Sequence, residues 1–554
     1  MIQIKLKNVN NPDKWITIKD GNNSVHIRGY LYYKHKLLKG NELANFIQKL
    51  AFDEILRILK DVNGFFAVIK KKENKLIAVV DRLRSIPLFY GLEGKNFYLS
   101  DDPHWILERI ADKSCDMKSQ KEFLATGYVT GSDTLYKNIK QIQAGEVLLF
   151  TDNANTNVNI ETKRYYKYIK QSDFTENFDI LLEALDDRVN NVFERLIKVL
   201  DGRPVVIPLS GGYDSRLIAV MMKEFNYENV ICFSYGRPGN TESKISQQVA
   251  RNLGYRWEFV PYSNKSWHNW YYSKEMQHYM LFGGGFSSVP HIQDWPAVWE
   301  LKKNDRIPEN SIFIPGHSAD FIAGSHITNI YKIYGKVYGE EKLLKTIVNY
   351  HYNLYKWPKR DFLVFRDKIL SFLSSGEWDI ETFEGLANFF EYWDWQERQA
   401  KFIVNSVRVY EFWGYDWLIP LWDNELMDFF IKVPLEYRLN KKLYDTYVKN
   451  KYGKFTSGNQ QIILGYKSMM IRYLKRLLYM LFLDKSVRRF YIKNNHMFKK
   501  FLYKKEYYNH PLGWYGIIEL DEFKKVYTGR ENINTFLSRK YLNELNSISN
   551  IKEI

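Results

Sequence analysis

One six-residue run has residue types and spacing suited to chemistry: Ser-Gly-Gly-Tyr-Asp-Ser at positions 210–215. It follows the apolar stretch Pro204–Leu209 and precedes an apolar-periodic stretch, so we expect a strand, a tight turn and a helix N-terminus. Glycines leave backbone N–H groups uncovered, and a helix N-terminus attracts anions. The run therefore predicts a phosphate cradle, whose candidate contacts are Leu209, Ser210, Gly211, Gly212, Asp214 and Ser215.

Asp214 is the acidic residue of this run and would repel phosphate, so its expected partner is a cation. A Mg²⁺ ion that also binds phosphate oxygens meets that need. The chain contains no Gly-Lys-Ser or Gly-Lys-Thr, which excludes a Walker loop. Ser-Gly-Gly-x-Asp-Ser instead resembles the pyrophosphate-loop enzymes, which cleave ATP to AMP and pyrophosphate. The alternative is an ordinary Gly-Gly turn between a strand and a helix.

Two more apolar runs lead into candidate site residues. The run Val230–Gly236 lies one helix after the first strand, and this βαβ order predicts a parallel, doubly wound sheet with its ligand at the carboxyl ends of the strands. Phe233 and Ser234 are then candidates to flank adenine and ribose, although they could simply end a strand. The run Ile312–Ile314 is likewise followed by a small-residue loop that contains Asp320.

Composition favours globular domains and excludes several other classes. At 554 residues the chain is too long for one hydrophobic core, and we expect about two to four domains. Its two cysteines, Cys115 and Cys232, lack metal-site spacing and are too few for a disulfide scaffold. The N-terminus lacks a signal-peptide core, and the longest apolar run, residues 477–483, is too short to span a bilayer. We therefore expect a cytoplasmic protein.

The net charge of +16 raises the question of nucleic acid or anionic lipid as a partner. The lysines are spread along the chain without a long basic arm, so we expect no nucleic-acid partner, and anionic substrates explain the charge equally well. Residues 470–482 combine an apolar stripe with Arg and Lys. This cationic amphipathic stretch leaves peripheral membrane contact open, but the commoner role of such a stripe is to pack on its own domain.

The first 170 residues consist of short apolar runs separated by turns, which predicts a layered, β-rich domain. The runs Gly64–Ala67, Asp81–Arg82 and Ile86–Tyr90, with the later Ile139–Gly145, resemble the glutamine amidotransferase domain of asparagine synthetases. Together with the loop at 210–215, this resemblance extends from about residue 60 to about residue 450.

The resemblance implies an α/β protein with three parts. Residues 1–170 would form an N-terminal Ntn-hydrolase-like β-sandwich that is a degenerate glutamine amidotransferase domain. Residues 175–460 would form a doubly wound parallel-sheet ATP-pyrophosphatase domain of the adenine nucleotide α-hydrolase type, mostly helical in its C-terminal part. Residues 461–554 would form a basic helical extension. The implied cofactors are ATP and Mg²⁺.

One departure from that family concerns the glutaminase reaction. The active enzymes use an N-terminal cysteine exposed by methionine removal, whose α-amine serves as base. Position 2 here is Ile2, and neither cysteine is near the start. We therefore predict that the domain has no glutaminase activity and is retained as a structural partner, in which respect the chain is similar to β-lactam synthetases.

Further site residues follow from the same resemblance. The segment containing Gly316 and Asp320 resembles the family's Gly-x-Gly-x-Asp loop, so Asp320 would be the second Mg²⁺ ligand beside Asp214; alone, it would be assigned as a helix cap. The family has Glu, or Tyr in the β-lactam synthetases, near His317. The run 414–423 resembles Gly-x-Glu-x-Arg-x-Pro-Phe-Leu-Asp, with Asp416 at the catalytic carboxylate.

His317 and Asp416 could thus form a base dyad in which the carboxylate orients the imidazole. The alternative for His317 is a loop histidine bonded to backbone. Lys467 is the candidate for the family's late lysine, which offsets charge in the second half-reaction; a solvated surface lysine is the alternative.

The combined hypothesis is ATP-dependent amide formation through an acyl-adenylate, in which an amine or ammonia attacks an activated carboxylate. We expect a small-molecule, peptide or sugar carboxylate, in bacterial surface-polysaccharide or natural-product synthesis. Intramolecular closure to a β-lactam or macrolactam is the first alternative, and a non-catalytic nucleotide-binding or partner-binding descendant is the second. A homo-oligomer remains open.

Overall fold

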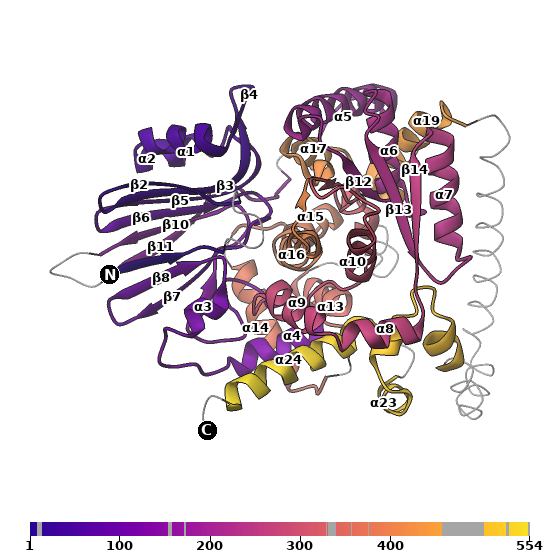
Figure 1. Ribbon diagram of the computed structural model, residues 1–554. Coiled ribbons are helices and arrows are strands. Elements are labelled where there is room, and N and C mark those ends of the chain that lie inside the picture. The colour runs from indigo at the N-terminus through magenta and orange to yellow at the C-terminus, as the bar shows by residue number, and fades with distance from the viewer. Residues whose placement is uncertain are drawn as a thin grey trace.

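The computed structural model describes residues 1–7, 14–152, 158–170, 173–327, 330, 339–355, 357–374, 376–456, 503–527 and 531–551. Two stacked sheets form one side of the molecule, and a parallel sheet with helices on both faces forms the other (Figure 1). The predicted stretch 470–482 and the candidate Lys467 lie outside the described residues.

The N-terminal part contains two sheets. The larger has the order β11-β10-β6-β5-β3-β2 with β4 paired to β3, all antiparallel, and consists of β2 (Ile16–Asp20), β3 (Asn23–Tyr33), β4 (Lys36–Lys39), β5 (Asn63–Lys72), β6 (Lys75–Val80), β10 (Glu146–Thr151) and β11 (Asn159–Arg164). The smaller has the order β1-β8-β7-β9, with β1 parallel to β8, and consists of β1 (Ile2–Lys5), β7 (Phe89–Glu93), β8 (Asn96–Ser100) and β9 (Ile139–Gln141).

Strand β5 is buried on both faces. Its side chains point to opposite faces of the sheet in turn. Ala67 and Ile69 face the smaller sheet and pack in one core with Phe97, whereas Phe66 and Val68 belong to the core beneath α1 (Gly40–Lys49) and α2 (Phe52–Ile58). Because both faces are covered, the central residues 65–69 of the strand are all apolar. The predicted N-terminal sandwich is confirmed.

The third sheet is parallel throughout and has the order β14-β13-β12-β15-β16. It consists of β12 (Val205–Pro208), β13 (Val230–Gly236), β14 (Arg256–Pro261), β15 (Ile312–Phe313) and β16 (Asp416–Trp417). The chain adds β13 and β14 on one side of β12 and then returns to add β15 and β16 on the other. The loops that follow β12 and β15 therefore adjoin at a topological switch point, where open α/β sheets bind their ligands.

Helices surround this sheet and fill the space between it and the sandwich. Those before β15 are α5 (Phe178–Leu200), α6 (Tyr213–Glu224), α7 (Thr241–Leu253), α8 (Asn264–Tyr271), α9 (Lys274–Gly284) and α10 (Trp295–Lys303). Those after it include α11 (Ala319–Ile322), α13 (Glu340–His351), α14 (Asp361–Leu373), α15 (Phe383–Trp393), η1 (Asp394–Ile403), η2 (Val404–Val407), α16 (Arg408–Phe412), α17 (Asn424–Phe430), α18 (Leu435–Arg438) and α19 (Lys442–Gly453).

The C-terminal residues join the two halves rather than forming a separate body. Helix α24 (Ile533–Ile551) runs along the base of the molecule next to α4 (Met117–Thr126) (Figure 1). Tyr541 packs so closely on Gly284 that a methyl group there would lie 2.3 Å from its hydroxyl, and Thr535 donates a hydrogen bond of 2.6 Å to the carbonyl of Leu354. Within the described ranges, no helix has the length and apolar character needed to cross a membrane.

Candidate active site

The loop after β12 is held together by its own two hydroxyls. The Ser210 amide donates to Ser215 Oγ at 3.1 Å, and the Gly212 amide donates to Ser210 Oγ at 3.1 Å. Gly212 is the N-cap of α6, so Asp214 and Ser215 occupy the first helical turn. The predicted strand, turn and helix start are present, and the arrangement presents backbone amides of the 12-residue helix α6 at the carboxyl edge of the sheet.

Gly316 brings the second loop against the first. A Cβ atom at this position would lie 2.5 Å from the Ser215 amide nitrogen and 3.0 Å from the Asp214 carbonyl carbon. Both neighbouring atoms are backbone, so they cannot rotate aside. Only glycine allows this approach, and the approach sets the distance between the two loops.

Asp214 and Asp320 meet as a result. The Asp320 amide donates to Asp214 Oδ2 at 3.1 Å. Burial, and after it the nearby Asp320 carboxylate, raise the pKa of Asp214 to about 7 against the opposing effect of Lys441. Two carboxylates from separate loops, one of them costly to ionise, suit a hard cation with oxygen ligands.

The donor set fits Mg²⁺ in particular. No cluster of three or more His, Cys, Asp or Glu side chains able to hold a metal ion occurs in the described part of the chain. Mg²⁺ is commonly held by only one or two carboxylates, with phosphate oxygens and water completing its octahedron. Asp214 and Asp320, beside the loop predicted to bind phosphate, match that pattern.

The structure adds two residues that sequence reasoning missed. Lys441 forms an ion pair with Asp320 and lies 3.5 Å from Asp445. The buried Tyr444 lies next to Asp214, and burial together with that carboxylate raises the pKa of its hydroxyl. Lys441 is 121 residues from Asp320 in the chain. It reaches the site because Asn440 and Lys441 both adopt left-handed backbone conformations before α19, which no residue pattern here predicts.

His317 has different partners from those predicted. Its Nε2 lies 2.7 Å from Ser406 Oγ on η2. Burial, and after it His291, lower the pKa of His317 to about 4 against the opposing effect of Asp294. Asp294 itself is bound by His291 Nε2 at 3.0 Å and by the Tyr410 hydroxyl at 2.7 Å. His317 therefore carries a neutral imidazole near pH 7, in a buried polar group that includes a carboxylate.

Asp416 is not part of this group, which corrects the predicted His317–Asp416 dyad. It lies in β16 opposite Ile312, at the amino end of the parallel strands. Its carboxylate pairs with Arg203, which precedes β12, at 2.8 Å, and lies 3.9 Å from Lys14. His317 and Asp320 follow the carboxyl end of β15. The sheet therefore separates Asp416 from the site.

The remaining candidates differ in how they are placed. Phe233 is fully buried, and its ring packs against Tyr235 and Phe313. Its carbonyl oxygen accepts a hydrogen bond of 2.9 Å from the Leu209 amide. Ser234 is 6% exposed in the same strand. Their predicted contact with a nucleoside stays a prediction. Lys467 lies outside the described residues, and the lysine found beside the two aspartates is Lys441.

Comparison with known proteins gives two adjoining family matches. A model described as a glutamine amidotransferase domain matches residues 23–166, and one described as asparagine synthase matches residues 160–288. The putative glutamine-hydrolysing asparagine synthetase 2 of Methanocaldococcus jannaschii is 26% identical over 234 residues, 41% of either chain. The glutamine-hydrolysing asparagine synthetase 3 of Bacillus subtilis is 28% identical over 164 residues, 29% of this chain and 25% of that protein.

The chain thus spans less than half of the length of the curated relatives it matches. Among solved structures, an NH3-dependent NAD synthetase from Campylobacter jejuni is 15% identical to this chain. The matched region covers 36% of this chain and 85% of that synthetase, and its TM-score of 0.19 is too low to support an argument. The two family matches and the two relatives show that parts of this chain are similar to asparagine synthetases, and they agree with the mixed α/β fold described above.

Proposed function

We propose that this asparagine synthetase-like chain uses ATP to join a carboxylate to an amine or ammonia, releasing AMP and pyrophosphate. The observation that carries the proposal is the meeting of Asp214 and Asp320 beside the amides that begin α6. A site that only positioned a strand and a helix would have no need for two converging carboxylates. A site that holds Mg²⁺ against pyrophosphate requires them.

In the proposed first step, a substrate carboxylate oxygen attacks the α-phosphorus of ATP and the bond to pyrophosphate breaks. The amide of Gly211 and the N-terminus of α6 hold phosphate oxygens. Asp214 and Asp320 would hold Mg²⁺, which when bound neutralises phosphate charge. Lys441 adds a positive charge at the same edge, and we assign to it the role predicted for Lys467.

In the second step, the amine attacks the activated carbonyl, the bond to AMP breaks, and the amine loses a proton. We assign His317 as the group that takes this proton, since its imidazole is neutral and follows the same strand end as Asp320. Ser406 orients the ring through its contact with Nε2. Asp294 lies near enough to favour the protonated ring electrostatically.

We further propose that the N-terminal domain has no glutaminase activity. A nucleophilic cysteine needs an accessible, stabilised thiolate. Burial raises the pKa of both thiols, that of Cys232 to about 12 within β13 of the synthetase sheet. The nitrogen source would then be ammonia or an amine taken directly, as in an enzyme of the β-lactam-synthetase type. The basic charge suits an anionic acid, such as a sugar acid of surface-polysaccharide or natural-product synthesis.

Carboxylate-dependent exchange between ATP and labelled pyrophosphate tests the first step. Wild-type protein should catalyse Mg²⁺-dependent exchange with at least one acid of a panel of sugar acids, amino acids and peptides. Asp214→Asn and Asp320→Asn should each lower exchange at least 100-fold, because each removes half of the carboxylate pair. Asp187→Asn, an exposed position on α5, is the matched control and should retain it.

The same experiment decides between the alternatives. Exchange with one acid followed by unimolecular AMP release would favour ring closure. Exchange that needs no carboxylate, or its absence with every acid while nucleotide still binds, would contradict the proposal and favour a binding protein.

A further inference from the structure

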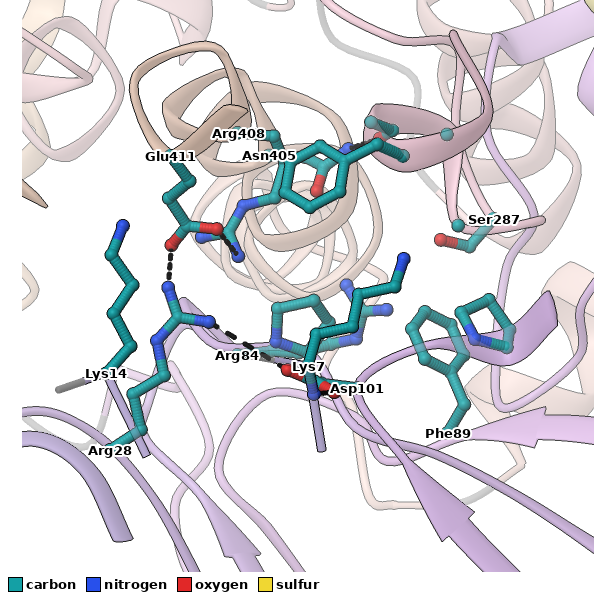
Figure 2. Close-up of a pocket in the computed structure, with 16 residues that line it drawn as sticks. Lys7, Lys14, Arg28, Arg84, Phe89, Asp101, Ser287, Asn405, Arg408 and Glu411 are labelled. Atoms are coloured by element: carbon teal, nitrogen blue, oxygen red, sulfur yellow. Dashed lines mark hydrogen bonds and ion pairs between the residues drawn. The ribbon is translucent and has the colours of Figure 1, made fainter. Parts of the chain in front are cut away.

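A partly enclosed cavity lies between the β-sandwich and the part of the chain that contains the parallel sheet. Its walls come from β3 and the loop 81–88 on one side and from the glycines 283–285, Asn405 and α16 on the other (Figure 2). The cavity has a volume of about 30 Å³. A space of about 10–15 Å³ on this measure holds one water molecule. The cavity therefore has room for about two waters or one small ion.

Four of the five cations around this cavity already have carboxylate partners. Arg28 pairs with Glu411, and Arg408 binds the other oxygen of Glu411 at 2.8 Å (Figure 2). Arg28 also lies 4.0 Å from Asp101. The remaining two are lysines: Lys7 pairs with Asp102 at 3.1 Å, and Lys14 lies 3.9 Å from Asp416. Asp416 is shared with Arg203, which lies 2.8 Å from it.

Arg84 is the fifth cation, and it is not balanced. It is 2% exposed, and its Nε and Nη2 atoms have no hydrogen-bond partner among the residues that the structure describes. The two carboxylates whose charge acts on it, Asp81 and Glu397, do not hydrogen-bond to these two nitrogen atoms. Asp81 accepts hydrogen bonds from the Phe66 amide at 3.1 Å and the Leu83 amide at 2.8 Å, and Glu397 binds Lys401 at 2.5 Å.

An unpaired buried guanidinium is costly unless something neutralises it. The opposite wall offers nothing to do so, because the three glycines carry no side chains and the Asn405 amide nitrogen is bonded to the Gly283 carbonyl at 2.6 Å. The residues that line the cavity include five cations but only two carboxylates, Asp101 and Glu411, and the space fits one small ion. We propose that this cavity binds a single small monovalent anion, of the size of chloride or formate, on the guanidinium of Arg84.

The position of this site gives the anion a structural role. Arg84 belongs to the sandwich, whereas Arg408, whose Nε also lacks a partner among the described residues, belongs to α16. An anion between these two guanidinium groups joins the two halves of the chain. The proposal is independent of the proposed function, since it concerns a cavity that His317, Asp214 and Asp320 do not line, and it requires no catalysis.

The first test measures the thermal midpoint of the full chain in potassium gluconate while chloride or formate replaces gluconate at constant ionic strength. Gluconate is too large for the cavity. Wild-type protein should show a saturable rise of about 2–5 °C at an anion concentration near 100 times the dissociation constant. Arg84→Gly should abolish the rise. Glycine suits the backbone at this position, where φ is +54°, so the variant should fold.

Lys34→Gly is the matched control, because it removes an exposed cation whose φ is +48° and leaves the cavity intact. It should respond to chloride as wild type does. A crystal grown or soaked in bromide gives a second, independent readout: one anomalous peak within hydrogen-bond distance of the Arg84 guanidinium. An equal response of wild type and Arg84→Gly, no saturable response in wild type, or an empty cavity in the bromide map would each overturn the proposal.

Discussion

Replacing Gly316 with alanine tests whether the approach of the two loops creates the metal-binding pair. The added Cβ would lie 2.5 Å from the Ser215 amide nitrogen, whereas ordinary van der Waals contact begins near 3.4 Å. One of the loops must therefore move by about 0.9 Å. Overpacking of this kind costs about 1–3 kcal/mol of stability. A displacement of about 1 Å of catalytic groups lowers rates about 100-fold.

The assay is Mg²⁺-dependent ATP–pyrophosphate exchange. The free energy of unfolding by urea is measured on the same full-length proteins. Gly316→Ala should lower exchange about 100-fold and raise the Mg²⁺ concentration needed for half-maximal rate, because Asp320 is displaced from Asp214. Gly212→Ala is the matched control: φ at Gly212 is −79°, and its added Cβ would have one contact within 4 Å, at 3.3 Å to Ser210 Oγ. It should leave stability and the Mg²⁺ requirement near wild type.

The refuting result is specific. If Gly316→Ala unfolds at the wild-type urea concentration and keeps exchange within about threefold, the second loop does not press on α6. The spacing of Asp214 and Asp320 would then not depend on Gly316, and the two carboxylates would not form a preformed metal site. A variant that is merely unstable, with normal Mg²⁺ dependence per folded molecule, would refute the link to the metal while leaving the steric argument intact.

Two other substitutions separate the half-reactions. His317→Gln should retain exchange but lower amide formation at least 100-fold. The rate of amide formation by the wild type should not change between pH 8 and pH 6, because burial lowers the pKa of His317 to about 4. A wild-type rate that falls along a titration near pH 6.5 would contradict this. Lys441→Met should raise the Michaelis constant for pyrophosphate about tenfold, since it removes the cation at Asp320. Lys442→Met, at the first residue of α19, is the control and should leave this constant unchanged. Equal effects of the two substitutions would show that net positive charge, and not the contact with Asp320, determines the constant.

The parts of the site that sequence predicted share one property: they follow buried parallel strands. Asp214 and Asp320 each come a few residues after such a strand, and parallel strands end at the same edge of a sheet, so their meeting could be expected. Lys441 could not be found in this way. It reaches Asp320 through two successive left-handed residues, and lysines are too frequent in this chain for a single one to stand out.

The failure of the Asp416 assignment has a similar physical cause. The motif at 414–423 places a carboxylate at Asp416 but does not predict at which edge of the sheet it lies. In the structure β16 has two residues and pairs Asp416 with Ile312, the first residue of β15, so the carboxylate lies at the amino edge. There it pairs with Arg203; both side chains are 35% exposed, and a pair of this kind contributes about 0–1 kcal/mol.

Asp416 therefore serves to attach the last strand rather than to move protons. The register it helps to set is continued by the Leu418 amide, which donates to the Phe313 carbonyl at 2.9 Å. Phe313 ends β15, and the chain then enters the loop that contains His317 and Asp320. A pair at the amino edge thus helps to position the loop at the carboxyl edge. It follows that the proton acceptor has to be sought among groups beyond the carboxyl ends of the strands, and His317, with Asp294 near it, meets that condition.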